Sequence, residues 1–135
     1  MSDVLTTQDK QTLQIAAHGV LALMAGADPG PISSTKAGIA GGLAMSSATG
    51  LVGHVLAAKP ANLGLKGTIA GIADRVLPAL TSSVELLDAK APEESDNFRT
   101  TITAISQSAA QASGGAASPS QAALIAKIQA AVDTA

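Results

Sequence analysis

Apolar residues recur at intervals of three and four along most of the chain, which is the spacing that places them on one face of an α-helix. The clearest run lies within 92–112 and consists of Phe98, Ile102, Ile105, Ala109 and Ala112. A second run, within 68–90, consists of Ile69, Ala73, Val76, Leu80, Val84 and Leu87. No segment of useful length alternates apolar and polar residues, so we expect no strands. The pattern predicts one all-α domain over residues 1–135, a compact bundle of about five to seven helices.

Local signals mark where several of these helices begin. Thr6 and Asp9 have the spacing of a capping box at the start of a first helix that reaches Met24. Pro92 and the acidic residues after it predict another start, since negative charge is favoured at the positive end of the helix dipole. The run 118–121 joins a serine cap, a proline and a glutamine, and it therefore predicts a last helix. The residues that this helix directs inward are Leu124, Ile125, Ile128 and Val132.

Pro78 falls inside the periodic segment 68–90 and leaves two possibilities open. Proline lacks the N–H that a helix interior uses, and its ring clashes with the preceding turn. It therefore either kinks one long helix or divides it in two, with Thr81 or Ser82 capping the second part.

The most unusual stretch is 37–58, which places 22 uncharged residues between Lys36 and Lys59. Five of them are glycine, and His54 is the one strongly polar side chain. A membrane-spanning helix needs about 20 predominantly apolar residues, so one alternative is a membrane-associated protein that uses this stretch.

The polar and glycine residues within the stretch favour a different interpretation. The segment 46–50 contains two serines, a threonine and a glycine, and it predicts a break between two short helices. Gly38 and Gly42 have the spacing that lets two helices approach closely. We therefore expect this stretch to be buried against the longer amphipathic helices, and we expect no membrane span.

Composition and charge exclude several classes of function. Hydrophobic residues make up 47% of the chain, and Phe98 is its one aromatic residue. The net charge is −2 without a basic patch, so nucleic-acid binding lacks both its electrostatic and its stacking contribution. The absence of cysteine excludes disulfides and thiolate sites. The first residues are polar and mildly acidic, unlike a secretory signal, so we expect a cytoplasmic protein.

Few residues suggest chemistry. His18 and His54 are the only histidines, and with Asp28 (or Asp74) they are the candidate metal ligands. No HxxxH or HxxE spacing supports this site, and the simpler interpretation places each histidine at a helix seam or half exposed. The acidic run 93–96 is explained by the dipole of the helix that begins there. No catalytic grouping is present, so we expect no enzyme, no catalytic residues and no cofactor.

Two turns resemble a motif of the TerB-like tellurite-resistance domains, an all-helical family with two copies of a pattern A-D-G-x-x-S/T-x-x-E. Residues 27–33 resemble the first copy, and residues 113–128 resemble the second. The resemblance implies a similar order of helices and, in the family, metal binding by acidic residues of the two turns. Of these residues Asp28 is present, whereas Gly114 and Gln121 stand where the family has an aspartate and a glutamate. The resemblance therefore supports a fold and not a metal site.

Together these features lead to three functional hypotheses. The first is a non-enzymatic helical interaction or structural protein, with a protein partner or self-association through a small-residue helix face. The second is a TerB-like stress-response protein that binds a metal or a ligand. The third is a membrane-associated protein that uses 37–58.

Overall fold

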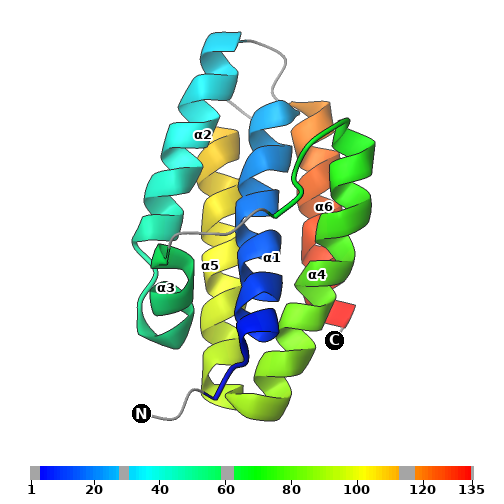
Figure 1. Cartoon of the computed structure of the whole chain (residues 1–135). Coiled ribbons are helices and arrows are strands. Elements are labelled where there is room, and N and C mark those ends of the chain that lie inside the picture. The colour runs from blue at the N-terminus through cyan, green and yellow to red at the C-terminus, as the bar shows by residue number, and fades with distance from the viewer. Residues whose placement is uncertain (1–3, 28–30, 59–62, 113–117, 135) are drawn as a thin grey trace.

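The fold is all-α, as the apolar periodicity predicts. The computed structural model describes residues 4–27, 31–58, 63–112 and 118–134, with the backbone alone for 31–34. Within these ranges the chain forms six helices and no strand. They are α1 (Thr7–Gly26), α2 (Pro31–Ser46), α3 (Gly50–Ala57), α4 (Ile69–Lys90), α5 (Pro92–Gln111) and α6 (Pro119–Thr134) (Figure 1).

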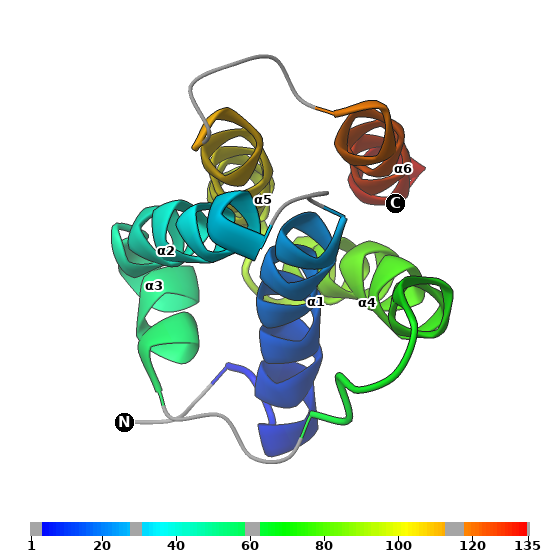
Figure 2. The same cartoon turned by 90° about the horizontal axis from the view of Figure 1, so that it is seen from above.

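Helix α1 is the centre of the bundle and packs against each of the other five helices. Seen from above, α2 and α3 lie on one side of α1, α4 lies on the other, and α5 and α6 lie behind (Figure 2). Its crossing with α4 is close, because a Cβ added at Gly19 would overlap the Cγ2 atom of Val76. The side chains of α1 that are fully buried belong to Leu13, Ala16, Ala17, Val20, Leu23 and Met24.

Both predicted capping boxes form. The Asp9 N–H donates to Thr6 Oγ1, and the Thr6 N–H donates to Asp9 Oδ2, each at 3.0 Å. At the start of α6 the Gln121 N–H donates to Ser118 Oγ at 3.2 Å, and the Ser118 N–H donates to Gln121 Oε1 at 3.1 Å. Of the apolar residues predicted to face inward from α6, three are buried and Ile125 is half-buried against the core.

Pro78 does not divide the segment in which it lies. Helix α4 continues through it from Ile69 to Lys90. Pro78 is exposed, so the carbonyl that its missing N–H leaves unpaired can face water, while Leu80 on the opposite side is fully buried. The alternative of a divided helix capped by Thr81 or Ser82 is therefore wrong, and the Thr81 hydroxyl donates instead to the Ala131 carbonyl of α6 at 2.7 Å.

The uncharged stretch forms two helices, α2 and α3, with the predicted break at 47–49. Within the described ranges no helix is both long enough and apolar enough to cross a membrane. The prediction that Gly38 and Gly42 allow a close approach to the other helices of the bundle is wrong. A Cβ at Gly41 would lie 2.5 Å from Leu21 Cδ1, whereas a Cβ at Gly38 or Gly42 would meet nothing within 4 Å. Gly41 is therefore the glycine that faces the core, where it lies against Leu21 of α1 and against Ile105 and Ala109 of α5.

Candidate functional site

The short helix α3 is held at its N-terminus by a carboxylate from α5. The Val52 N–H donates to Glu94 Oε1 at 2.9 Å, while the N-cap residue Thr49 makes no side-chain capping bond. Asn97 Nδ2 donates to the Thr49 carbonyl at 2.8 Å and to Glu94 Oε1 at 3.2 Å. Gly50 has φ +71°, and a Cβ there would lie 3.0 Å from both Glu94 oxygens. Glu94 therefore serves two helix starts, that of α5 and that of α3.

The other end of α3 is held by a buried amide from α1. Gln14 Nε2 donates to the Val55 carbonyl at 3.2 Å and to the Ala58 carbonyl at 3.4 Å. These carbonyls lie at the C-terminal end of α3, where a helix leaves its last acceptors unpaired. Hydrogen bonds from α1 and α5 thus fix both ends of α3, and they also fix the end of α2 through the short 47–49 connection.

Helix α2 presents a face with two large apolar side chains. Ile39 is 61% exposed and Leu43 is 65% exposed, and they lie one turn apart. Beside them Gly38 and Gly42, also one turn apart, face open space. Helical geometry continues these two rows to Ser47 and Ser46, which are both exposed. We refer to the α2 outer face for the set Gly38, Ile39, Gly42, Leu43, Ser46 and Ser47.

A hollow of about 270 Å³ adjoins the α2 outer face. Its lining residues are Met45, Ser46, Ala48, Gly53, Leu56 and Ala57, and none of them is charged. Ser46 belongs both to the hollow and to the α2 outer face. The uncharged surface of α2 therefore continues into the junction between α2 and α3.

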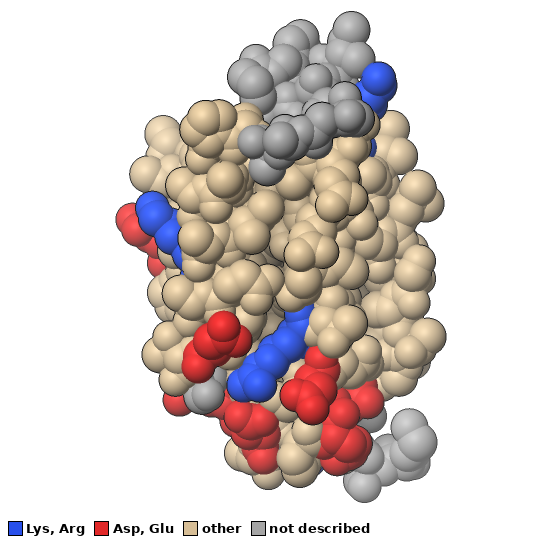
Figure 3. All heavy atoms as spheres, turned by 180° about the vertical axis from the view of Figure 1, so that it is seen from behind, with Lys and Arg blue, Asp and Glu red and all other residues tan. Residues whose placement is uncertain are grey.

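Charge is distributed unevenly over the bundle. No Asp, Glu, Lys or Arg occurs in 37–58 or in 100–112, which supply α2 beyond Lys36, all of α3 and the second half of α5. Acidic residues gather where α1 and α5 begin and α4 and α6 end (Figure 3). They are Asp9, Glu85, Asp88, Glu93, Glu94, Asp96 and Asp133. Helix α3 and the part of α2 beyond Lys36 thus carry no charged side chain of their own.

One ion pair ties the charged end together. Lys90 Nζ at the end of α4 donates to Asp9 Oδ2 at the start of α1. This hydrogen bond, with that from the Thr6 N–H, lowers the pKa of Asp9. Asp9 thereby completes the α1 capping box and also joins α1 to α4.

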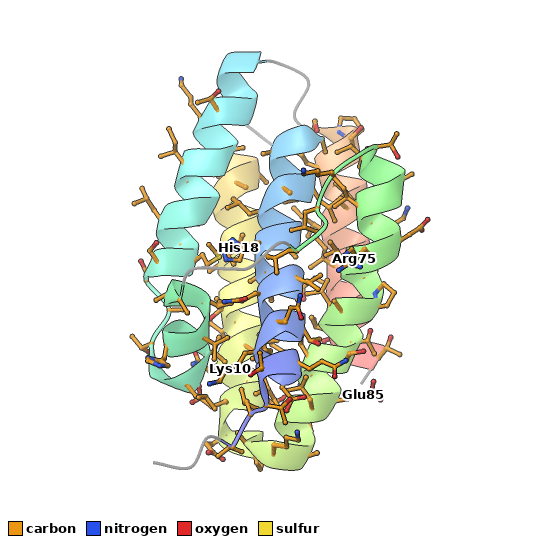
Figure 4. All side chains as sticks on the ribbon, in the orientation of Figure 1. Lys10, His18, Arg75 and Glu85 are labelled. Carbon is orange, nitrogen blue, oxygen red and sulfur yellow. The ribbon has the colours of Figure 1, made fainter. Side chains whose placement is uncertain are left out.

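The histidines do not form a metal site with the described acidic residues. His18 is half-buried on the side of α1 toward α2, whereas Arg75 and Glu85 lie on α4 (Figure 4). His54 is exposed on α3, and Asp28 lies outside the described residues. In the described part of the chain, no three His, Cys, Asp or Glu side chains are grouped as metal ligands would be. The metal hypothesis that includes Asp28 stays a prediction.

His18 itself has an unusual environment. Burial lowers its pKa, because the imidazolium is disfavoured away from water. Its Nε2 atom is buried, and no hydrogen-bond partner for it lies among the described residues. His18 follows Gln14 by one turn and therefore lies on the same side of α1. A neutral imidazole at this position fits a helix seam, which is the simpler of the two interpretations drawn from the sequence.

A second hollow lies where α1 ends and α4 and α6 begin. Its volume is about 650 Å³, and its described lining residues are Gly26, Ala27, Ile69, Ala70, Ala73, Ser120, Ala123, Leu124 and Lys127. One N–H at each adjacent helix start is already capped, since Gly71 donates to Thr68 Oγ1 and Gln121 donates to Ser118 Oγ. These residues are small or aliphatic apart from the Lys127 ammonium group, and they carry no polar arrangement that would select a ligand.

No family model, curated protein or solved structure matches the chain. The TerB-like resemblance therefore stays a prediction. Gln121, which stands where that family has a glutamate, completes the α6 capping box and donates to the Met24 carbonyl at 3.4 Å. The capping box stabilises the start of α6, and the bond to Met24 joins α6 to the end of α1. Gln121 therefore has a structural role.

Proposed function

We propose that this chain is a non-enzymatic interaction module and that the α2 outer face is the surface with which it binds a protein partner. The observation that carries the proposal is the exposure of Ile39 and Leu43 on a helix whose residues from Ala37 to Met45 are all apolar or glycine. A helix with apolar residues on every side is usually buried on every side. Here the core covers one side of α2, and a partner would cover the other.

A comparison with α4 supports this interpretation. Helix α4 also lies at the edge of the bundle, but its exposed side carries the charged residues Asp74, Arg75, Glu85 and Asp88. The exposed side of α2 beyond Lys36 carries none. Covering the exposed parts of Ile39 and Leu43 would contribute about 1–2 kcal/mol for each side chain.

Buried hydroxyl groups support a role without catalysis. Ser83 Oγ donates to the Ala79 carbonyl at 2.7 Å, and Thr101 Oγ1 donates to the Asn97 carbonyl at 2.8 Å. Ser106 Oγ donates to the Thr103 carbonyl at 3.0 Å. These hydroxyls are engaged by carbonyls of their own helices, and none of these contacts pairs a hydroxyl with a general base.

Site-specific photo-crosslinking tests the proposal. A photoreactive amino acid replaces Ser46, at the edge of the α2 outer face, so that Ile39 and Leu43 stay intact. The matched control replaces Ala126, which is exposed on α6. In the organism that produces the chain, we expect defined protein adducts at position 46 and not at position 126. Equal labelling at the two positions, or no adduct at position 46, would contradict the proposal.

A further inference from the structure

We infer that the partner of the α2 outer face is a second copy of this chain, packed α2 against α2 about a two-fold axis. The inference rests on the proposed function and makes it specific. It is drawn from the shape of the face, its charge and its size.

The shape of the face is complementary to itself. Ile39 and Leu43 are spaced by four and form a ridge along α2, and Ser47 extends this ridge just beyond the end of the helix. Gly38, Gly42 and Ser46 are also spaced by four, and the missing side chains of the two glycines make the neighbouring row a groove. A ridge of this spacing packs into a groove of the same spacing when two helices cross at about −50°. A two-fold axis places each ridge in the other copy's groove at once.

The glycines matter for how close the two helices come. A Cβ at Gly38 or Gly42 would meet nothing within 4 Å in the single chain, so neither glycine is required by the packing of its own copy. Glycine in a helix interior destabilises that helix relative to alanine. In the pair, the two glycines let the helix axes approach to about 8 Å, the short end of the usual range.

Charge allows the same pairing. Each chain has a net charge of −2, and most of its described acidic residues gather at the end of the bundle where α1 and α5 begin. The α2 outer face and the adjacent α3 carry no Asp, Glu, Lys or Arg. Two identical molecules can therefore meet through this side without placing like charges opposite each other, which they could not do through the acidic end.

The size of the face sets the strength of the association. One face of one helix provides less buried area than the roughly 1,200 Å² at which stable interfaces of standard size begin. We therefore expect a reversible dimer whose population rises with protein concentration, in fast exchange with the monomer. The dimer interface is centred between Ile39 and Leu43.

Sedimentation velocity over a concentration series tests the inference. For the natural sequence we expect a shift from monomer to dimer. The double variant Ile39→Glu, Leu43→Glu places like charges across the axis, so we expect its dimer dissociation constant to rise by more than about tenfold. The control Ala126→Glu adds a charge to an exposed position of α6 and should leave the dimer unchanged.

A second variant fills the groove without adding a charge. Gly38→Gln with Gly42→Gln introduces good helix formers where each chain has open space, so the monomer should melt no earlier, as circular dichroism can show. The same change blocks the partner's ridge, and the dimer should be lost. This pairing of an intact fold with a lost dimer separates the interface from any general effect on folding.

Three results would overturn the inference. They are a natural chain that stays monomeric at all concentrations, a dimer that survives the two glutamates, and a dimer that survives the two glutamines. If the natural chain is monomeric but position 46 cross-links to a different protein, the proposed function stands and the second copy is excluded. If position 46 gives no adduct, the proposed function fails as well.

Discussion

Replacing Glu94 should detach the N-terminus of α3. Glu94→Ala removes the acceptor for the Val52 N–H at 2.9 Å and one acceptor for Asn97 Nδ2 at 3.2 Å. A hydrogen bond to a charged group contributes about 1.5–3 kcal/mol, and loss of a helix cap costs about 1 kcal/mol. Since both descriptions apply to the same contact, they are not added, and we expect a loss of about 2 kcal/mol in the free energy of unfolding.

The neighbouring carboxylate supplies the control. Glu93 is exposed in the same first turn of α5, so it shares the favourable interaction with the α5 dipole, about 0.3–1 kcal/mol. Urea unfolding of Glu93→Ala and Glu94→Ala therefore isolates the contact with α3. Amide hydrogen exchange should show faster exchange of α3 in Glu94→Ala alone. Equal destabilisation by the two variants, with α3 equally protected in both, would refute the capping of α3 by Glu94.

Two further predictions concern the glycines and His18. Gly19→Ala should lower the free energy of unfolding by about 1–3 kcal/mol, since its Cβ overlaps Val76; Gly42→Ala, in open space, should raise it by about 0.5–1 kcal/mol. Similar urea midpoints for both variants would contradict these packing environments. The lowered pKa of His18 means that the unfolded chain binds more protons below its ordinary value near 6.5, so stability should fall as the pH drops from about 6.5 to the folded pKa. His18→Gln should remove this part of the pH dependence, and an unchanged slope in unfolding titrations would contradict the assignment.

The features that the sequence predicts correctly are local ones. The capping boxes at Thr6 and Ser118 need only residues three positions apart. The break before Gly50 follows from a cluster of residues that disfavour helix interiors. The buried faces of α4 and α5 follow from regular spacing, since their outer sides are polar and only one orientation buries the apolar residues.

The features that the sequence does not reveal depend on how distant segments meet. The hydrogen bonds from the Val52 N–H to Glu94 and from Gln14 Nε2 to the Val55 carbonyl join residues about forty positions apart, and neither has a local signature. The sequence also does not determine which side of α2 faces the core. Because residues 37–45 of α2 are apolar or glycine on every side, their pattern does not distinguish the side of Gly41 from the side of Gly42. Because α2 lies at the edge of the bundle, the same uniform pattern leaves apolar side chains exposed on the α2 outer face.

Chemical cross-linking gives the most direct test of the central claim that two α2 helices face each other. The chain has no cysteine, so a single Ser46→Cys substitution provides one thiol at the edge of the α2 outer face while Ile39 and Leu43 stay intact, and Ala126→Cys provides one on α6. With a bis-maleimide reagent at a concentration where the chain associates, Ser46→Cys should form covalent dimers much faster than Ala126→Cys. Equal rates of dimer formation by the two variants would contradict the pairing of α2 with α2.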